Sequence, residues 1–185
     1  MVYWRGMSIL SWGRGTKGPK VAAMTYPEWA ELAKSMGQRK FVARYEGFFL
    51  LSTDDTLELQ TVMQTQSLSG PKAKGSLARR TFEVLPVARA ADGDEDAPIT
   101  IGRTRTCDVA FKHPSVSKVH AHLILRGNSL SVVDLQSRNG TLHNGNPVPA
   151  DKPSKVAVRD RLQFGSVQTM VLDAHELYDL LAMMP

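Results

Sequence analysis

Short strand-like runs separated by turn signals fill the chain from residue 82 to residue 172. Apolar and β-branched residues recur in each run, and turn pairs such as Gly127-Asn128 and Asn144-Gly145 separate the runs. Repeated short strands with close turns predict a β-sandwich. The predicted strands cover residues 82–87, 99–101, 108–111, 121–125, 130–134, 141–142, 156–158 and 167–172.

The N-terminal part, residues 1–66, predicts a small α+β extension of unknown role. Thr25 and Glu28 have capping-box spacing, and an apolar stripe at helical period follows them. That stripe consists of Trp29, Leu32, Ala33 and Met36. Residues 41–51 are rich in aromatic and aliphatic side chains, which predicts a strand, whereas residues 57–63 fit either a helix or a strand.

Residues 67–80 are rich in Gly, Ser and Lys and poor in large apolar side chains, which predicts a linker. The β-sandwich then occupies residues 81–172, and Asp173 caps a short C-terminal helix over residues 173–185. The apolar stripe of this helix is Leu177, Leu180, Leu181 and Met184. Because both helical stripes need an apolar partner, we expect residues 21–66 and 173–184 to form one subdomain beside the sandwich.

The net charge of +5 is unevenly distributed along the chain. Residues 1–80 hold 12 Lys and Arg against 6 Asp and Glu, so the basic excess lies there. Most of these cations stand in Gly- and Lys-containing tracts, and we interpret them as solvating charges, with nucleic-acid binding as an alternative. The chain shows neither an export signal nor a long apolar run, and we expect a cytoplasmic protein without a membrane partner.

Several motifs that would indicate an enzyme or a metal protein are incomplete. Residues 13–20 spell a dinucleotide fingerprint, but no strand precedes them. Ser117 lacks a nucleophile elbow, and His120 with His122 lacks further ligands for a metal. The single Cys107 excludes an internal disulfide and a cysteine zinc site. We therefore predict no catalytic residue, no cofactor and no metal.

Four short signals follow one another within the predicted sandwich. They are Gly102-Arg103, Ser117-Lys118-Val119-His120, Ser137-Arg138-Asn139-Gly140-Thr141 and Asn144-Gly145. Together they supply a guanidinium, a hydroxyl and a side-chain amide on loops between strands. A planar guanidinium meets two oxygens of a phosphate, and an amide both donates to and accepts from a peptide backbone. This set predicts recognition of a phosphate together with the backbone beside it.

This ordered motif set resembles that of the forkhead-associated (FHA) domain, a phosphothreonine-recognition module, over roughly residues 82–172. The resemblance implies a mainly β, FHA-type β-sandwich with an N-terminal α+β extension and a short C-terminal helix. It implies phosphate binding by Arg103, Ser117 and Lys118, and contact with the peptide backbone by Arg138 and Asn139. It implies structural support of the binding loops by Gly102, His120, Gly140, Thr141, Asn144 and Gly145.

The function implied is a non-enzymatic adaptor that binds a phosphothreonine-containing protein downstream of a Ser/Thr protein kinase. A phosphate-independent scaffold and a nucleic-acid binder acting through residues 1–80 are the alternatives. The chain departs from the family pattern at Arg159-Asp160, where the family commonly has Gly-Asp. This departure concerns the turn before the last strands rather than the phosphate-binding residues.

Overall fold

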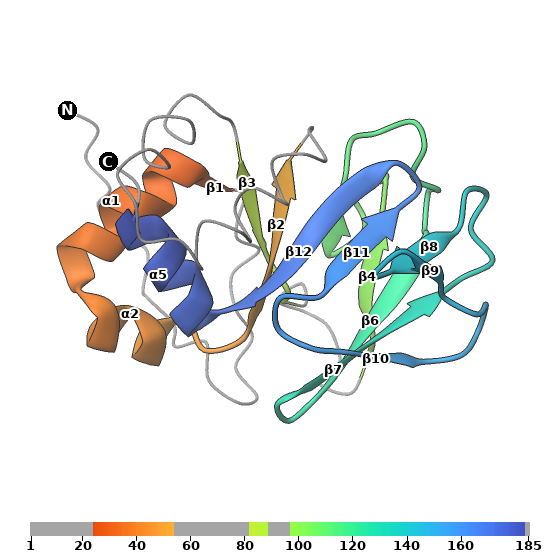
Figure 1. The fold of residues 1–185 in the computed structure, drawn as a ribbon. Coiled ribbons are helices and arrows are strands. Elements are labelled where there is room, and N and C mark those ends of the chain that lie inside the picture. The colour runs from red at the N-terminus through yellow and green to blue at the C-terminus, as the bar shows by residue number, and fades with distance from the viewer. Residues whose placement is uncertain (1–23, 54–81, 89–96, 184–185) are drawn as a thin grey trace.

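The computed structural model describes residues 24–53, 82–88 and 97–183 of the 185-residue chain. In these residues two β-sheets pack face to face, and three helices cover the outer face of the larger sheet at one end of it (Figure 1). The strand order is β1-β3-β2-β12-β11-β8-β9 in the larger sheet and β10-β7-β6-β4-β5 in the smaller one. The predicted mainly β sandwich with accompanying helices is confirmed.

The larger sheet consists of β1 (Met24–Thr25), β2 (Phe48–Thr53), β3 (Glu83–Pro86), β8 (Thr141–His143), β9 (Asn146–Pro147), β11 (Arg161–Phe164) and β12 (Val167–Asp173). The smaller sheet consists of β4 (Ile99–Gly102), β5 (Val109–Ala110), β6 (Ala121–Arg126), β7 (Ser129–Asp134) and β10 (Ser154–Val156). The helices are α1 (Tyr26–Met36), α2 (Gln38–Arg44) and α5 (Ala174–Met183). Among these strands, β4 and β5 pair in parallel and the other neighbours are antiparallel.

The larger sheet is buried on both faces where it lies between the helices and the smaller sheet. In β2, Leu50 belongs to the core between the sheets, whereas Phe49 and Leu51 belong to the core under the helices. Successive side chains of a strand point to opposite faces, so a strand covered on both sides has a continuous apolar run. This requirement explains the sequence Phe-Phe-Leu-Leu at the start of β2.

The helical layer is held by aromatic packing. The ring of Trp29 on α1 meets the rings of Phe41, Tyr45 and Phe49 edge to face, with centroids 5.2–6.1 Å apart. Helix α5 lies against α1 and α2 through its buried leucines, as the apolar stripes predict. Its N-terminus is capped by Asp173, whose Oδ1 accepts a hydrogen bond of 2.8 Å from the backbone N–H of Glu176.

The strand predicted over residues 41–51 is wrong in its first half. Residues 38–44 form α2, which starts again after Gly37 (φ 72°), and the strand β2 begins only at Phe48. A helix forms here because α2 consists mainly of good helix formers and turns Phe41 into the aromatic cluster under α5. The short strands β9 and β11 were not predicted, and β10 begins two residues before the predicted strand 156–158.

Strand β2 lies inside the larger sheet, between β3 and β12, although its residues belong to the predicted extension. The segment 57–63, the predicted linker 67–80 and the tract 13–20 lie outside the described residues.

In the described ranges, no helix has the length and apolar character needed to cross a membrane. Helices α1, α2 and α5 gather at one end of the molecule, and the β8–β9 hairpin lies at the other (Figure 1).

Candidate functional site

Three loops converge at Ser117, and these carry the residues predicted to bind phosphate. The backbone N–H of Arg103, directly after β4, donates to the carbonyl oxygen of Ser117 at 2.9 Å. The backbone N–H of Arg138, between β7 and β8, donates to the Ser117 hydroxyl oxygen at 3.1 Å. The side chains of Arg103, Lys118 and Arg138 are exposed, and that of Ser117 is half-buried. The structure thus brings together the backbones of basic residues from three separate sequence motifs.

Gly102 permits the loop that holds Arg103 to lie close to the backbone of Lys118. A Cβ atom at this position would lie 2.3 Å from the carbonyl oxygen of Lys118 and 2.8 Å from the sulfur of Cys107. That same carbonyl oxygen accepts hydrogen bonds from the Thr104 hydroxyl at 3.0 Å and from the Cys107 thiol at 3.3 Å. A side chain larger than that of glycine would therefore clash at this position. The buried Cys107 stabilises the loop that contains Lys118 through its hydrogen bond.

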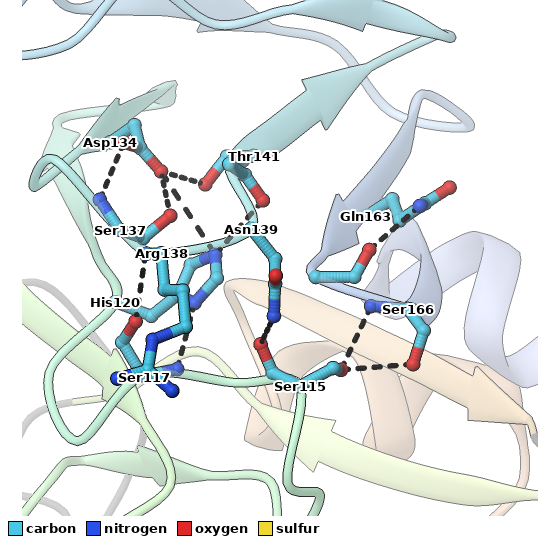
Figure 2. Close-up of polar contacts among 12 residues, drawn as sticks. Ser115, Ser117, His120, Asp134, Ser137, Arg138, Asn139, Thr141, Gln163 and Ser166 are labelled. Carbon is cyan, nitrogen blue, oxygen red and sulfur yellow. Dashed lines mark hydrogen bonds and ion pairs between the residues drawn. The ribbon is translucent and has the colours of Figure 1, made fainter.

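His120 is fully buried beneath the loops and joins two of them (Figure 2). Its Nδ1 accepts a hydrogen bond of 3.0 Å from the backbone N–H of Ser117, and its Nε2 lies 3.1 Å from the carbonyl oxygen of Gly140. Because Nδ1 accepts, the imidazole is neutral and carries its proton on Nε2, which donates to Gly140. Burial lowers the pKa of His120, in keeping with the neutral form, against opposing effects of Gly140 and Asp134.

Asp134, at the end of β7, anchors the third loop and was missed in the sequence. The carboxylate is buried and accepts three hydrogen bonds: from the backbone N–H and the hydroxyl of Ser137, and from the Thr141 hydroxyl at 2.6 Å (Figure 2). Burial alone raises the pKa of Asp134, but the bonds from Thr141 and Ser137 outweigh it and hold the pKa below its ordinary value. An Asp at a strand end with Ser three residues later was the available signal.

Replacing Asp134 by Asn should destabilise the domain by about 1–3 kcal/mol at pH 7, because the amide cannot accept all three bonds. A carboxyl group with a depressed folded-state pKa stabilises above its unfolded-state pKa, and this stabilisation is lost as the pH falls through the folded-state pKa. The deficit of Asp134→Asn should therefore shrink when urea unfolding is repeated at about pH 3 instead of pH 7. A deficit independent of pH would contradict an ionised Asp134.

Asn139 is exposed on the same loop, next to the cations. Its side-chain Nδ2 donates to the carbonyl oxygen of Ser115 at 2.7 Å, and because a carbonyl oxygen only accepts, this bond fixes which end of the amide is nitrogen. Gly140, which follows, has φ 72° and completes the turn. Asn139 is thus oriented by the loop that precedes Ser117.

Asn144 and Gly145 lie farther along the chain, in the tight turn between β8 and β9. Both have positive φ, as a two-residue hairpin turn requires. The Asn144 side chain donates to Asp160 at 2.8 Å and accepts from the backbone N–H of Arg161 at 2.8 Å. Their contacts are therefore with the turn before β11, and they reach the candidate site only through β8.

Arg159 occupies the position where the family pattern has glycine. It adopts φ 71°, its backbone N–H donates to the carbonyl oxygen of Val171 at 2.7 Å, and its guanidinium binds both carboxylate oxygens of Glu176 on α5 at 2.8 and 2.9 Å. Asp160 next to it accepts from the backbone N–H of Ala157 and lies 2.7 Å from Nε2 of His143. The turn thus forms without glycine, and its arginine connects the sandwich to the C-terminal helix.

The positive φ of Arg159 gives a testable order of stabilities. Arg159→Ala loses the ion pair with Glu176 and keeps the strained backbone, whereas Arg159→Gly loses the same pair and relieves the strain. We expect the Gly variant to exceed the Ala variant by about 0.5–1 kcal/mol in free energy of unfolding. Urea unfolding of the two variants measures this difference, and equal stabilities would contradict the strain.

A comparison with known protein families matches this region. Residues 99–165 match the model of the FHA domain. The chain contains an FHA domain. The matched residues run from β4 to the residue after β11 and include the loops that carry Arg103, Ser117 and Asn139.

The DNA damage response protein kinase DUN1 of Saccharomyces cerevisiae is similar to this chain, with 40% identity over 74 residues. The match covers 36% of this chain but only 14% of that kinase. The chain therefore corresponds to a small part of its relative, and kinase activity does not follow from the similarity.

Solved FHA domains are more distant. The FHA domain of CT664 from Chlamydia trachomatis has 19% identity and a TM-score of 0.42, with 69% of this chain and 98% of that chain covered. The N-terminal FHA domain of Rad53p from S. cerevisiae, in complex with a phosphothreonine peptide, has 21% identity and a TM-score of 0.39, with coverages of 45% and 73%. Since these TM-scores lie below 0.5, the family assignment depends on the matched sequence model.

Proposed function

We propose that this FHA domain binds phosphothreonine-containing peptides at the loops around Ser117. The observation that carries the proposal is the convergence of Arg103 and Arg138 on Ser117, through backbone hydrogen bonds to its carbonyl and hydroxyl oxygens. The Ser117 oxygen accepts, so its hydrogen is available to donate to a phosphate oxygen. The exposed side chains of Arg103, Arg138 and Lys118 belong to residues that adjoin Ser117 in the sequence or through these backbone hydrogen bonds.

The local charge supports an anionic ligand. Residues 103–107, 112–120 and 135–140 contain five Lys and Arg and no Asp or Glu. Charge-assisted hydrogen bonds to a phosphate dianion contribute roughly 1.5–3 kcal/mol each, more than bonds between neutral groups. A phosphorylated side chain therefore gains far more binding free energy at these loops than its unphosphorylated form.

The peptide backbone is the second part of the ligand. Asn139 donates to Ser115 through its side-chain nitrogen, and within the described part of the chain its side-chain oxygen accepts no hydrogen bond. An extended peptide presents N–H groups that need such an acceptor. We infer that the protein is a cytoplasmic adaptor. It recognises a protein that a Ser/Thr kinase has phosphorylated on threonine.

Binding of a degenerate phosphothreonine peptide library to the full chain tests this proposal. We expect selection of phosphorylated over unphosphorylated peptides, and loss of binding after phosphatase treatment. Equal retention of both forms would instead support a phosphate-independent scaffold. Retention of neither form, with salt-sensitive binding of oligonucleotides, would support the nucleic-acid alternative.

A further inference from the structure

A polar cluster outside the predicted site residues lies directly against Asn139. It consists of His113, Ser115 and Ser166, the first two on the loop before β6 and the last in the turn between β11 and β12. Figure 2 shows Ser115 bonded to both Asn139 and Ser166. The Ser115 hydroxyl oxygen lies 2.8 Å from Nδ1 of His113 and 2.9 Å from the Ser166 hydroxyl oxygen. It also accepts the backbone N–H of Ser166 at 2.9 Å.

The hydrogen bonds of this cluster have a consistent direction. Nδ1 of His113 accepts the backbone N–H of Ser115 at 3.2 Å, so this nitrogen carries no proton and also accepts the Ser115 hydroxyl hydrogen. The Ser115 oxygen then receives both the N–H and the hydroxyl of Ser166. Ser115 is therefore held from two sides, by His113 on its own loop and by Ser166, 51 positions away in the sequence.

The carbonyl group of Ser115 is fixed as well. A Cβ atom on Gly165 would lie 2.5 Å from this carbonyl oxygen, so the glycine turn packs directly against it. The carbonyl oxygen in turn accepts the bond from Nδ2 of Asn139. Of the hydrogen bonds in the described part of the chain, this is the one that orients the exposed Asn139 side chain.

We propose that Ser115, held by Ser166 and His113, is a positioning residue that turns the Oδ1 atom of Asn139 toward the bound peptide. In this orientation Oδ1 accepts a hydrogen bond from a peptide N–H. Without the hydrogen bond to Ser115, the exposed amide of Asn139 would become ordered only when the peptide binds, at a cost in side-chain entropy. The cluster orders the amide beforehand and so removes this cost from binding. The inference rests on the proposed function and assigns a task to residues that the family motif set does not include.

The test uses the phosphothreonine peptide selected best from the library, and a set of its analogues in which single backbone amides near the phosphothreonine are replaced by esters. An ester lacks the N–H, so one position should show weaker binding by about tenfold, the size of one hydrogen bond. Asn139→Ala should abolish this ester penalty.

Ser115→Ala and Ser166→Ala should each weaken binding of the all-amide peptide by about threefold to tenfold and reduce the ester penalty by the same factor. Binding of the ester peptide itself should stay unchanged. The matched control is Ser35→Ala on α1, whose hydroxyl donates to the carbonyl oxygen of Leu32 in the same helix, and which should leave both affinities unaltered. Thermal unfolding verifies that each variant is folded.

Two results would overturn the positioning role. One is equal weakening of the amide and ester peptides by Ser115→Ala and Ser166→Ala, since a general loosening of the loops moves both affinities. The other is the absence of an ester penalty in a wild-type protein that binds the phosphopeptide. Failure of the wild-type protein to select phosphorylated peptides would overturn the proposed function, and the inference with it.

Discussion

Replacement of Arg103 by alanine is expected to lower the affinity for a phosphothreonine peptide by about 2–5 kcal/mol, at least about 30-fold. The guanidinium is exposed in the free domain, and within the described residues its one hydrogen bond is a long one of 3.5 Å to the carbonyl oxygen of Pro114. The side chain therefore does little for the fold and is available to a ligand. Isothermal calorimetry measures the affinity, and thermal unfolding should show an unchanged domain.

Arg103→Lys separates charge from geometry at this position. Lysine retains the positive charge but cannot bind two phosphate oxygens through a planar fork, so its affinity should lie between those of wild type and Arg103→Ala. The control is Arg126→Ala, because this exposed arginine ends β6, a strand that begins beside His120 and runs away from the loops. Full affinity of a folded Arg103→Ala protein would contradict the proposed phosphate site.

The neighbouring hydroxyl should matter less than the guanidinium. Ser117→Ala removes one donor to the phosphate and leaves the backbone N–H of Arg138 without its present acceptor. The expected loss is about 1–2 kcal/mol of binding free energy. The ratio of the two effects thus reports whether charge or hydrogen bonding dominates recognition.

The sandwich was predictable because its strands are short, apolar and bounded by turn residues. The same local signals failed at residues 38–44, where burial of Phe41 against distant α5 decides in favour of a helix. They also failed for β9, whose two exposed residues have no apolar pattern of their own and pair with β8 in the folded sheet. In β11, Leu162 and Phe164 do alternate with polar residues, so this strand was missed although its pattern stands in the sequence. Context from residues far apart in sequence explains α2 and β9.

The candidate site likewise contains residues that the sequence identified and residues that it did not. The residues whose side chains face solvent, such as Arg103 and Asn139, stand in an ordered motif set and were found by their chemistry. Asp134 and Ser166 were not found, since each acts through a hydrogen bond that only the folded loops create. Arg159 was recognised as a departure, but its bond to Glu176 requires α5 to lie against the sandwich.

His120→Ala is expected to lower both stability and phosphopeptide affinity, because the imidazole connects the Ser117 loop with the Gly140 loop. Its loss leaves the half-buried backbone N–H of Ser117 and the carbonyl oxygen of Gly140 without their partner, at a cost of about 1–3 kcal/mol, and removes the edge-to-face packing on Phe164. Urea unfolding measures the first effect and calorimetry the second. An unchanged melting temperature together with abolished binding would instead make His120 a direct ligand contact.

The pH dependence of stability, measured together with binding, distinguishes the role of His120 from that of His122. Burial lowers its folded-state pKa, so the unfolded chain binds the proton more readily, and the stability is full above the ordinary histidine pKa of about 6.5 and falls as the pH decreases below it. Burial also lowers the pKa of His122, which lies on β6 two residues after His120, so the wild-type decline contains both contributions. His120→Gln and His122→Gln should each flatten the decline between pH 7.5 and about pH 5, but only His120→Gln should weaken phosphopeptide binding. If His122→Gln weakened binding equally, the two loops would not depend on His120 in particular, and the buried bridge between Ser117 and Gly140 would lose its assigned role.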